Sequence, residues 1–135
     1  MIVYLAGAIK GCSDTECNSW RDEAIDVLNR NNIGTLNPMD RDYRGIEDEN
    51  VNEIVELDKK DINNSDILLV SYIKPSVGTS MEVLYGYEKN KYIITFTIET
   101  KISPWLRYHS DKIYNSLTEG LNEILFRNTQ TIMGK

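Results

Sequence analysis

Two carboxyl residues and a tyrosine stand at positions where this chain can bring them together. Glu82 follows the turn Pro75-Ser76-Val77-Gly78-Thr79-Ser80, in which a glycine and three hydroxyl residues precede a helical pattern. Asp58 interrupts the apolar positions of an earlier helical pattern, and Tyr4 lies in the first apolar run. Two carboxyl groups, one ionised and one protonated, can perform glycoside chemistry, in which one attacks the sugar and the other protonates the leaving group.

The turn before Glu82 predicts a ligand-binding strand end. Gly78 allows positive φ and close approach of the backbone to a ligand, while Ser76 and Ser80 offer hydroxyls that cap a helix or hold an oxyanion. We place the helix at 81–89, so that Glu82 lies in its first turn and the helix dipole favours its ionised form. The alternative is that Glu82 only complements that dipole.

A second helix is predicted over 51–63, and Asp58 lies on its apolar face. The aliphatic residues at helical spacing on that face are Val51, Ile54, Val55 and Ile62. Because a carboxylate buried alone is costly, Asp58 either pairs at the rim with Lys59, Lys60 or the backbone, or is an acid with a raised pKa that faces a cleft. Both interpretations stay open from the pattern.

Strands and helices alternate along the chain. Strands are predicted at 2–6, 33–36, 66–72, 92–97 and 113–114, with helices between them and a final helix from Leu117. This alternation predicts a flavodoxin-like, doubly wound α/β domain with a five-stranded parallel sheet of order 2-1-3-4-5. In such a sheet the loops after the first and third strands adjoin, which gathers 7–11, 73–80 and Asp58 around one crevice.

Composition bounds the classes of function. We expect one domain over 1–128 and a flexible tail over 129–135. The net charge of −6, with both signs interspersed, argues against a nucleic-acid polymer as partner. The first apolar run is too short to span a membrane, so we expect a cytoplasmic protein without membrane contact. Cys12, Cys17 and the distant His109 do not have zinc-site spacing, and we expect no metal.

Four motifs in order carry a family resemblance. They read Val3-Tyr4-Leu5-Ala6-Gly7, Asp58 eight residues before Asp66, Gly78-Thr79-Ser80-Met81-Glu82, and Tyr85-Gly86-Tyr87 before Lys91-Tyr92-Ile93. The sequence thereby resembles the nucleoside 2-deoxyribosyltransferase family over residues 1 to 125. The resemblance implies that Glu82 is the nucleophile, that Asp58 exchanges a proton with the base and that Tyr4 orients Glu82. It also implies a homo-oligomer without a cofactor, which acts on a nucleoside or nucleotide and passes the sugar to a base or to water.

One position departs from the best-known transferases, which carry an Asp six residues before the nucleophile. This chain has Ser76 there, which resembles the related 2′-deoxynucleoside 5′-monophosphate N-glycosidases, where that serine helps bind the phosphate. Ser103 resembles a second phosphate contact from a neighbouring subunit, and Lys10 replaces a basic residue, although Ala8 stands where those enzymes have serine. We therefore hypothesise a phosphate pocket of Ser76, Lys10 and Ser103; the alternative is that all three lie in ordinary surface turns.

The substrate-binding candidates lie where strands end. They are Gly7, Ala8, Lys10, Asp40, Ser76, Gly78, Ser80 and Ser103. Three functions remain open: transfer between bases, hydrolysis of deoxynucleoside monophosphates, and nucleotide sensing without turnover. Ribosyl or dinucleotide substrates also remain possible.

Overall fold

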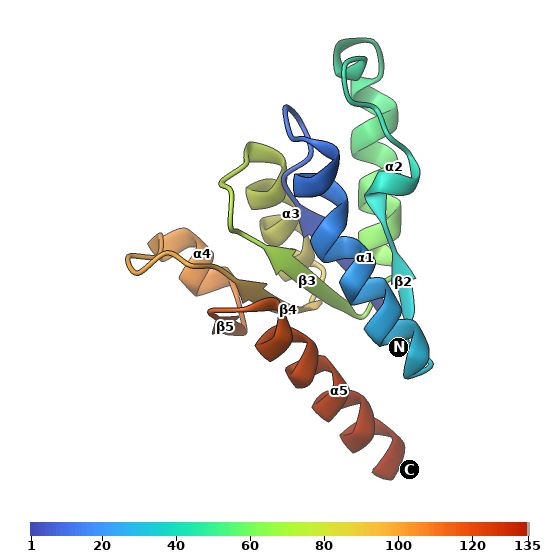
Figure 1. Ribbon diagram of the computed structural model, residues 1–135, viewed down its shortest axis with the longest axis vertical. Helices are drawn as coiled ribbons and strands as arrows, with labels where there is room; N and C mark the ends of the chain where they lie inside the picture. The colour runs from blue at the N-terminus through green and yellow to red at the C-terminus, as the bar shows by residue number, and fades with distance from the viewer. Residues whose placement is uncertain (135) are drawn as a thin grey trace.

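The computed structural model describes residues 1–134, and its centre is a five-stranded sheet (Figure 1). The strands are β1 (Ile2–Gly7), β2 (Gly34–Leu36), β3 (Ile67–Ser71), β4 (Tyr92–Phe96) and β5 (Lys112–Tyr114). Their order is β2-β1-β3-β4-β5, and every neighbouring pair is parallel. The predicted doubly wound fold and strand order are therefore confirmed.

Helices cover both faces of the sheet (Figure 1). On one face lie α1 (Asp14–Arg30) and α5 (Leu117–Met133); on the other lie α2 (Val51–Asn63), α3 (Val77–Glu88) and α4 (Pro104–His109). Two short 3₁₀ helices, η1 (Pro38–Asp40) and η2 (Glu47–Glu49), occupy the connection from β2 to α2. Parallel strands must be joined by crossovers, and this covering leaves the central strands buried on both sides.

Alternation along β1 decides which side chains face which layer of helices. Val3 and Leu5 belong to the core cluster under α1 and α5, whereas Tyr4 and Ala6 belong to the cluster under α2, α3 and α4. Successive residues of a strand point to opposite faces, so this division follows from the backbone alone. It directs Tyr4 toward the helix that carries Glu82.

Helix α3 begins earlier than the sequence pattern indicated. The Ser76 hydroxyl accepts a hydrogen bond from the Thr79 amide at 3.0 Å and caps the helix, so α3 starts at Val77 rather than at residue 81. Gly78 lies inside that helix and does not have positive φ. The expectations that Glu82 lies in the first turn and that Gly78 uses positive φ are therefore wrong.

Helix α2 has the predicted bounds, but its apolar face is only partly buried. Ile62 is buried, whereas Val51 and Val55 are 57% and 44% exposed. The N-terminal part of α2 extends past the ends of the strands (Figure 1), so no sheet lies beneath it. The apolar face that the spacing indicated is therefore buried only toward the end of the helix.

The final helix, α5, is longer than predicted. It continues to Met133, well into the segment 129–135 that the sequence pattern assigned to a tail. Leu121 and Ile124 are buried in the core and pack the first half of α5 against the sheet. Residue 135 of the predicted tail lies outside the described residues.

Candidate active site

The candidate site is built around a hydrogen bond between β1 and α3. The Tyr4 hydroxyl donates to Oε2 of Glu82, 78 residues further along the chain. Tyr4 is fully buried, and Glu82 is partly buried. Because β1 and β3 are neighbours and α3 follows β3, the crossover returns Glu82 beneath β1. One carboxylate oxygen is thereby held in place.

Burial dominates the electrostatics of Glu82. Loss of solvent raises the pKa of Glu82 to about 8, and the negative charge of Asp58 also raises this pKa, while the Tyr4 hydrogen bond and the positive charge of Arg21 lower it. We expected the helix N-terminus to keep Glu82 ionised. That expectation is wrong, because Glu82 lies beyond the first turn, where no free backbone N–H groups remain.

Tyr4 stays protonated in this environment. Burial raises the pKa of Tyr4 well above its usual value, and the neighbouring charges of Glu82 and Asp58 raise this pKa further. A phenol with a raised pKa acts as a hydrogen-bond donor at neutral pH. Tyr4 can therefore orient Glu82 without competing for its proton.

Asp58 lies close to this pair but has a partner of its own. The Nη2 atom of Arg41 donates to Oδ1 of Asp58 at 3.2 Å and to Oδ2 of Asp61 at 2.8 Å. Burial raises the pKa of Asp58, although the charge and hydrogen bond of Arg41 lower it. Of the two interpretations left open for Asp58, the paired one named Lys59, Lys60 or the backbone as partner, whereas the partner is Arg41 from the loop after β2. Asp58 is thus both paired and shifted toward its protonated form.

Sequence reasoning missed Arg41 and Arg21 as members of the site. Arg41 stands between two aspartates in a loop, and no local pattern marks it. Arg21 did carry a signal, because it lies four residues after Cys17 and three before Ala24, both buried on α1. It is a charged residue on an apolar helix face, and the same irregularity identified Asp58.

The hydroxyl residues at the start of α3 are engaged in local hydrogen bonds. Besides capping the helix, the Ser76 hydroxyl donates to the Thr79 hydroxyl at 2.8 Å. The Ser80 hydroxyl donates to the Ser76 carbonyl at 2.9 Å and lies 2.7 Å from the Tyr72 hydroxyl. A Cβ atom on Gly78 would meet nothing within 4 Å, so open space adjoins this turn. Capping of α3 is the role that these contacts support.

Strand β1 ends at a glycine that packing requires. A Cβ atom on Gly7 would lie 2.8 Å from Cζ2 of Trp20 and 3.3 Å from Cβ of Ser71. Ala8 is partly buried and Lys10 is exposed in the loop that follows. Since β1 and β3 pair in parallel up to Gly7 and Ser71, this loop and the Ser76 turn leave the same edge of the sheet.

Two other predicted contacts lie on separate elements. Asp40 is exposed at the end of η1, and Ser103 is exposed at the start of α4, where its hydroxyl accepts from the Trp105 amide at 3.2 Å. Within residues 1–134, no hydrogen bond or ion pair joins Ser103 to Lys10 or Ser76. The three residues of the hypothesised phosphate pocket are therefore not joined within one chain.

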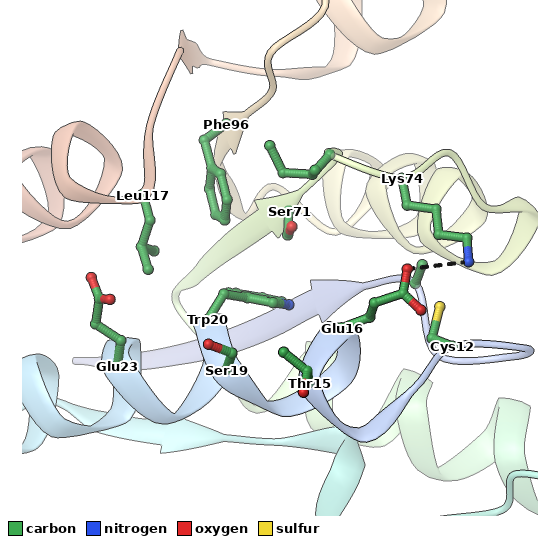
Figure 2. A pocket seen from close by; sticks show the side chains of 12 residues that line it. Cys12, Thr15, Glu16, Ser19, Trp20, Glu23, Ser71, Lys74, Phe96 and Leu117 are labelled. Carbon is green, nitrogen blue, oxygen red and sulfur yellow. Dashed lines mark ion pairs between the residues drawn. The ribbon is translucent and has the colours of Figure 1, made fainter.

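A pocket of about 300 Å³ opens on the α1 and α5 face of the sheet (Figure 2). Trp20 and Phe96 form part of its wall, and two further lining residues, Lys74 and Glu16, form an ion pair of 3.5 Å. It shares Ala8 with the predicted contacts but contains none of the Tyr4, Asp58 and Glu82 triad. In the described part of the chain no cluster of metal-ligating side chains is present.

The fold and the site together define a doubly wound α/β protein with a carboxylate site where the strand order reverses. The chain belongs to the family described as nucleoside 2-deoxyribosyltransferase like, whose family model matches residues 1–99. This membership confirms the resemblance, and the match ends before α4.

Solved structures of the same fold extend over most of the chain. A 2-deoxyribosyltransferase from Bacillus psychrosaccharolyticus has a TM-score of 0.71 and 17% identity, covering 90% of this chain and 91% of its own. The CMP N-glycosidase BcmB from Clostridium botulinum has a TM-score of 0.63 and 18% identity. This match covers 92% of this chain and 98% of BcmB. A conserved protein from Enterococcus faecalis V583 has a TM-score of 0.68 and 13% identity. This match covers 93% of this chain and 98% of that protein.

A search of the curated proteins found no match to this chain. Among residues 1–134, no helix has the length and apolar character needed to cross a membrane.

Proposed function

We propose that this protein cleaves the N-glycosidic bond of 2′-deoxynucleosides or of their 5′-monophosphates through a covalent deoxyribosyl intermediate on Glu82. The observation that supports this most strongly is the Glu82 carboxylate, held by Tyr4 and adjacent to Asp58, in a chain of the deoxyribosyltransferase-like family. A nucleotide sensor has no need of a carboxylate in this position. The sensing alternative is therefore less well supported.

The reaction follows the retaining pattern. The free oxygen of Glu82 attacks C1′ of the sugar, the bond from C1′ to the base nitrogen breaks, and Asp58 transfers its proton to the departing base. A second base, or water, then attacks C1′ from the opposite side, which releases Glu82 and returns a proton to Asp58. Tyr4 contributes by fixing the attacking carboxylate, which lowers the entropic cost of reaching the reactive geometry.

This chemistry requires a particular placement of one proton. Because the pKa of Glu82 is about 8, the proton of the carboxyl pair resides mainly on Glu82 near neutral pH. Attack requires the proton on Asp58 and the charge on Glu82. The proton must therefore move from Glu82 to Asp58. When Asp58 becomes protonated, the charge of Arg41 is still neutralised by Asp61, its closer partner at 2.8 Å.

The test is a chromatographic assay of the purified protein and of Glu82→Gln, an isosteric variant. Individual deoxynucleosides, deoxynucleoside 5′-monophosphates and CMP are each incubated with and without a free acceptor base. Base exchange or base release that is lost in Glu82→Gln is the expected result. If the native protein cleaves no glycosidic bond in any mixture, or if Glu82→Gln remains fully active, the proposal is wrong.

Hydrolysis of monophosphates is a second candidate, and Ser76 favours it. A serine at this position removes the repulsion that a carboxylate would exert on a phosphate. Because the Ser76 hydroxyl already caps α3, a phosphate would have to take over the Thr79 amide or bind the exposed Lys10. Faster cleavage of monophosphates than of deoxynucleosides would support this candidate, and the reverse order would exclude it.

We further propose a homo-oligomer in which Ser103 reaches a neighbouring subunit's site. Ser103 is exposed and does not contact the other phosphate candidates of its own chain. Light scattering coupled to gel filtration measures the assembly. In a mixture of Ser103→Asp and Glu82→Gln subunits, activity above that of either variant alone would support a shared site, and no gain would contradict it.

A further inference from the structure

Arg21 is the largest fully buried side chain described, with no exposed surface. Its Nη1 atom donates to the Cys17 carbonyl at 2.8 Å, and its Nη2 atom donates to the carbonyls of Gly7 at 3.0 Å and Leu5 at 3.4 Å. The guanidinium therefore ties α1 to the carboxyl end of β1. A Cβ atom on Gly7 would lie only 3.4 Å from Nη2, so the group packs directly against the strand end.

This buried cation has no carboxylate in contact with it. Within residues 1–134 no ion pair includes Arg21, and its Nε atom is buried without a hydrogen-bond partner. On its other side the guanidinium carbon lies 4.7 Å from the centre of the Trp20 ring. Burying a charge is costly unless an opposite charge lies near it. The acidic groups closest to Arg21 therefore offset part of the cost of burying its guanidinium.

Of the groups that become negative when they ionise, Glu82 acts on Arg21 most strongly. Burial lowers the pKa of Arg21, and of the neighbouring groups that oppose this shift, Glu82 acts most strongly. The effect is mutual, because the charge of Arg21 lowers the pKa of Glu82. The two side chains belong to helices on opposite faces of the sheet, and β1 lies between them.

The groups that face Glu82 come from three elements besides its own. Tyr4 of β1 donates a hydrogen bond, Asp58 of α2 contributes a negative charge, and Arg21 of α1 contributes a positive one. Arg41 neutralises Asp58 on its other side. Among the described residues, Arg21 is thus the cation whose charge favours an ionised Glu82.

We infer that Arg21 is a positioning residue for the nucleophile: its hydrogen bonds to the carbonyls of Leu5 and Gly7 hold the strand end that carries Tyr4, the donor to Glu82, and place a fixed positive charge at that strand end. The inference rests on the proposed role of Glu82 for its functional meaning. Arg21 thereby supplies the positive charge near Glu82 that we first assigned to the helix dipole. Glu82 lies too far along α3 for that dipole to favour its ionised form.

Three variants separate charge from packing. Arg21→Met removes the charge and keeps an apolar chain of similar length, and Arg21→Lys keeps the charge. Arg30→Met is the matched control, because it removes an arginine from the same helix at an exposed site that pairs with Asp26 at 2.8 Å. Thermal unfolding followed by circular dichroism verifies that each variant is folded.

The measurement is a ¹³C NMR titration of the glutamate carboxyl carbons, in which the Glu82 signal is assigned by its absence in Glu82→Gln. We expect Arg21→Met to raise the apparent pKa of Glu82 by roughly one unit, with little change in Arg21→Lys and Arg30→Met. An unchanged titration in Arg21→Met would overturn the inference. An equal shift in Arg21→Lys would also overturn it, since packing rather than charge would then be the cause.

A double-mutant cycle covers the case in which Arg21→Met does not fold. Arg21→Gln is then combined with Glu82→Gln, and the melting temperatures are compared at pH 9, where Glu82 is ionised. A smaller loss from Arg21→Gln in the Glu82→Gln background is expected, and equal losses in both backgrounds would contradict the inference. Neither measurement needs turnover, so a failure of the proposed activity would be seen separately, in the chromatographic assay.

Discussion

The Tyr4 hydroxyl on β1 donates a hydrogen bond to the Glu82 carboxylate on α3, across 78 residues of sequence. Tyr4 is fully buried and stays protonated, whereas Glu82 is partly buried and has a pKa of about 8. Tyrosine therefore serves as a fixed donor to a carboxyl group whose own charge depends on pH.

Tyr4→Phe should lower kcat without unfolding the protein. The substitution removes a hydrogen bond to a carboxylate, an interaction of about 1.5 to 3 kcal/mol, which corresponds to a loss of roughly 10- to 100-fold in rate. It should also raise the pKa of Glu82, because the Tyr4 hydrogen bond lowers that pKa. Steady-state kinetics and the carboxyl titration measure both effects. An unchanged kcat would mean that Tyr4 does not orient Glu82.

The value of kcat/KM should fall as the pH rises above about 8. The reactive state needs one proton shared by Asp58 and Glu82, and the last proton leaves the pair near the Glu82 pKa of about 8. At low pH both groups are protonated, and the rate should fall again. A profile of kcat/KM from pH 4 to 10 tests this. A plateau that continues to pH 10 would contradict the one-proton requirement.

Glu82→Gln should stabilise the protein at alkaline pH. The pKa of Glu82 is raised above its ordinary value of 4.5, so its folded-state contribution is fully favourable below that value and is lost as the pH rises through about 8. A neutral glutamine avoids that loss, which we place at a few kcal/mol. Chemical denaturation at pH 5 and pH 9 should show a gain in the free energy of unfolding that is larger at pH 9.

Arg41→Met should destabilise the protein modestly and alter Asp58. The variant removes two partly exposed ion pairs, with Asp58 and Asp61, which we expect to lower the free energy of unfolding by about 1 kcal/mol. The pKa of Asp58 should rise, because Arg41 lowers it. Urea denaturation compares the variant with Arg30→Met, whose exposed pair should contribute less. A smaller loss in Arg41→Met than in Arg30→Met would refute this ranking.

Lys10→Met should separate phosphate binding from catalysis. If Lys10 contacts a 5′-phosphate, kcat/KM for monophosphates should fall about tenfold, while that for free deoxynucleosides stays unchanged. Lys112→Met, which alters an exposed lysine on β5, is the control. Equal effects of Lys10→Met on both substrates would indicate that Lys10 does not recognise the phosphate.

The sequence alone was sufficient for the sheet order, and it supplied the hypothesis of a site around Tyr4, Asp58 and Glu82. Alternating strands and helices leave few topologies once right-handed crossovers are required, and α2 has the predicted bounds. Asp58 was identifiable because a charge on an apolar helix face contradicts a local pattern. Glu82 was proposed from the turn before its helix, and Tyr4 from the family resemblance. These are local properties, and a local pattern suffices to predict them.

Only the tertiary structure decided the partners and charges of these residues. Arg41 pairs with Asp58 from 17 positions away, and Arg21 reaches the end of β1 from α1. The pKa of Glu82 depends on how much solvent the assembled helices exclude and on charges from three other elements. Coulomb interactions and desolvation depend on distance in space, and distance along the chain carries little information about them. The sequence therefore identified the chemical groups, while the folded arrangement determined where the proton resides.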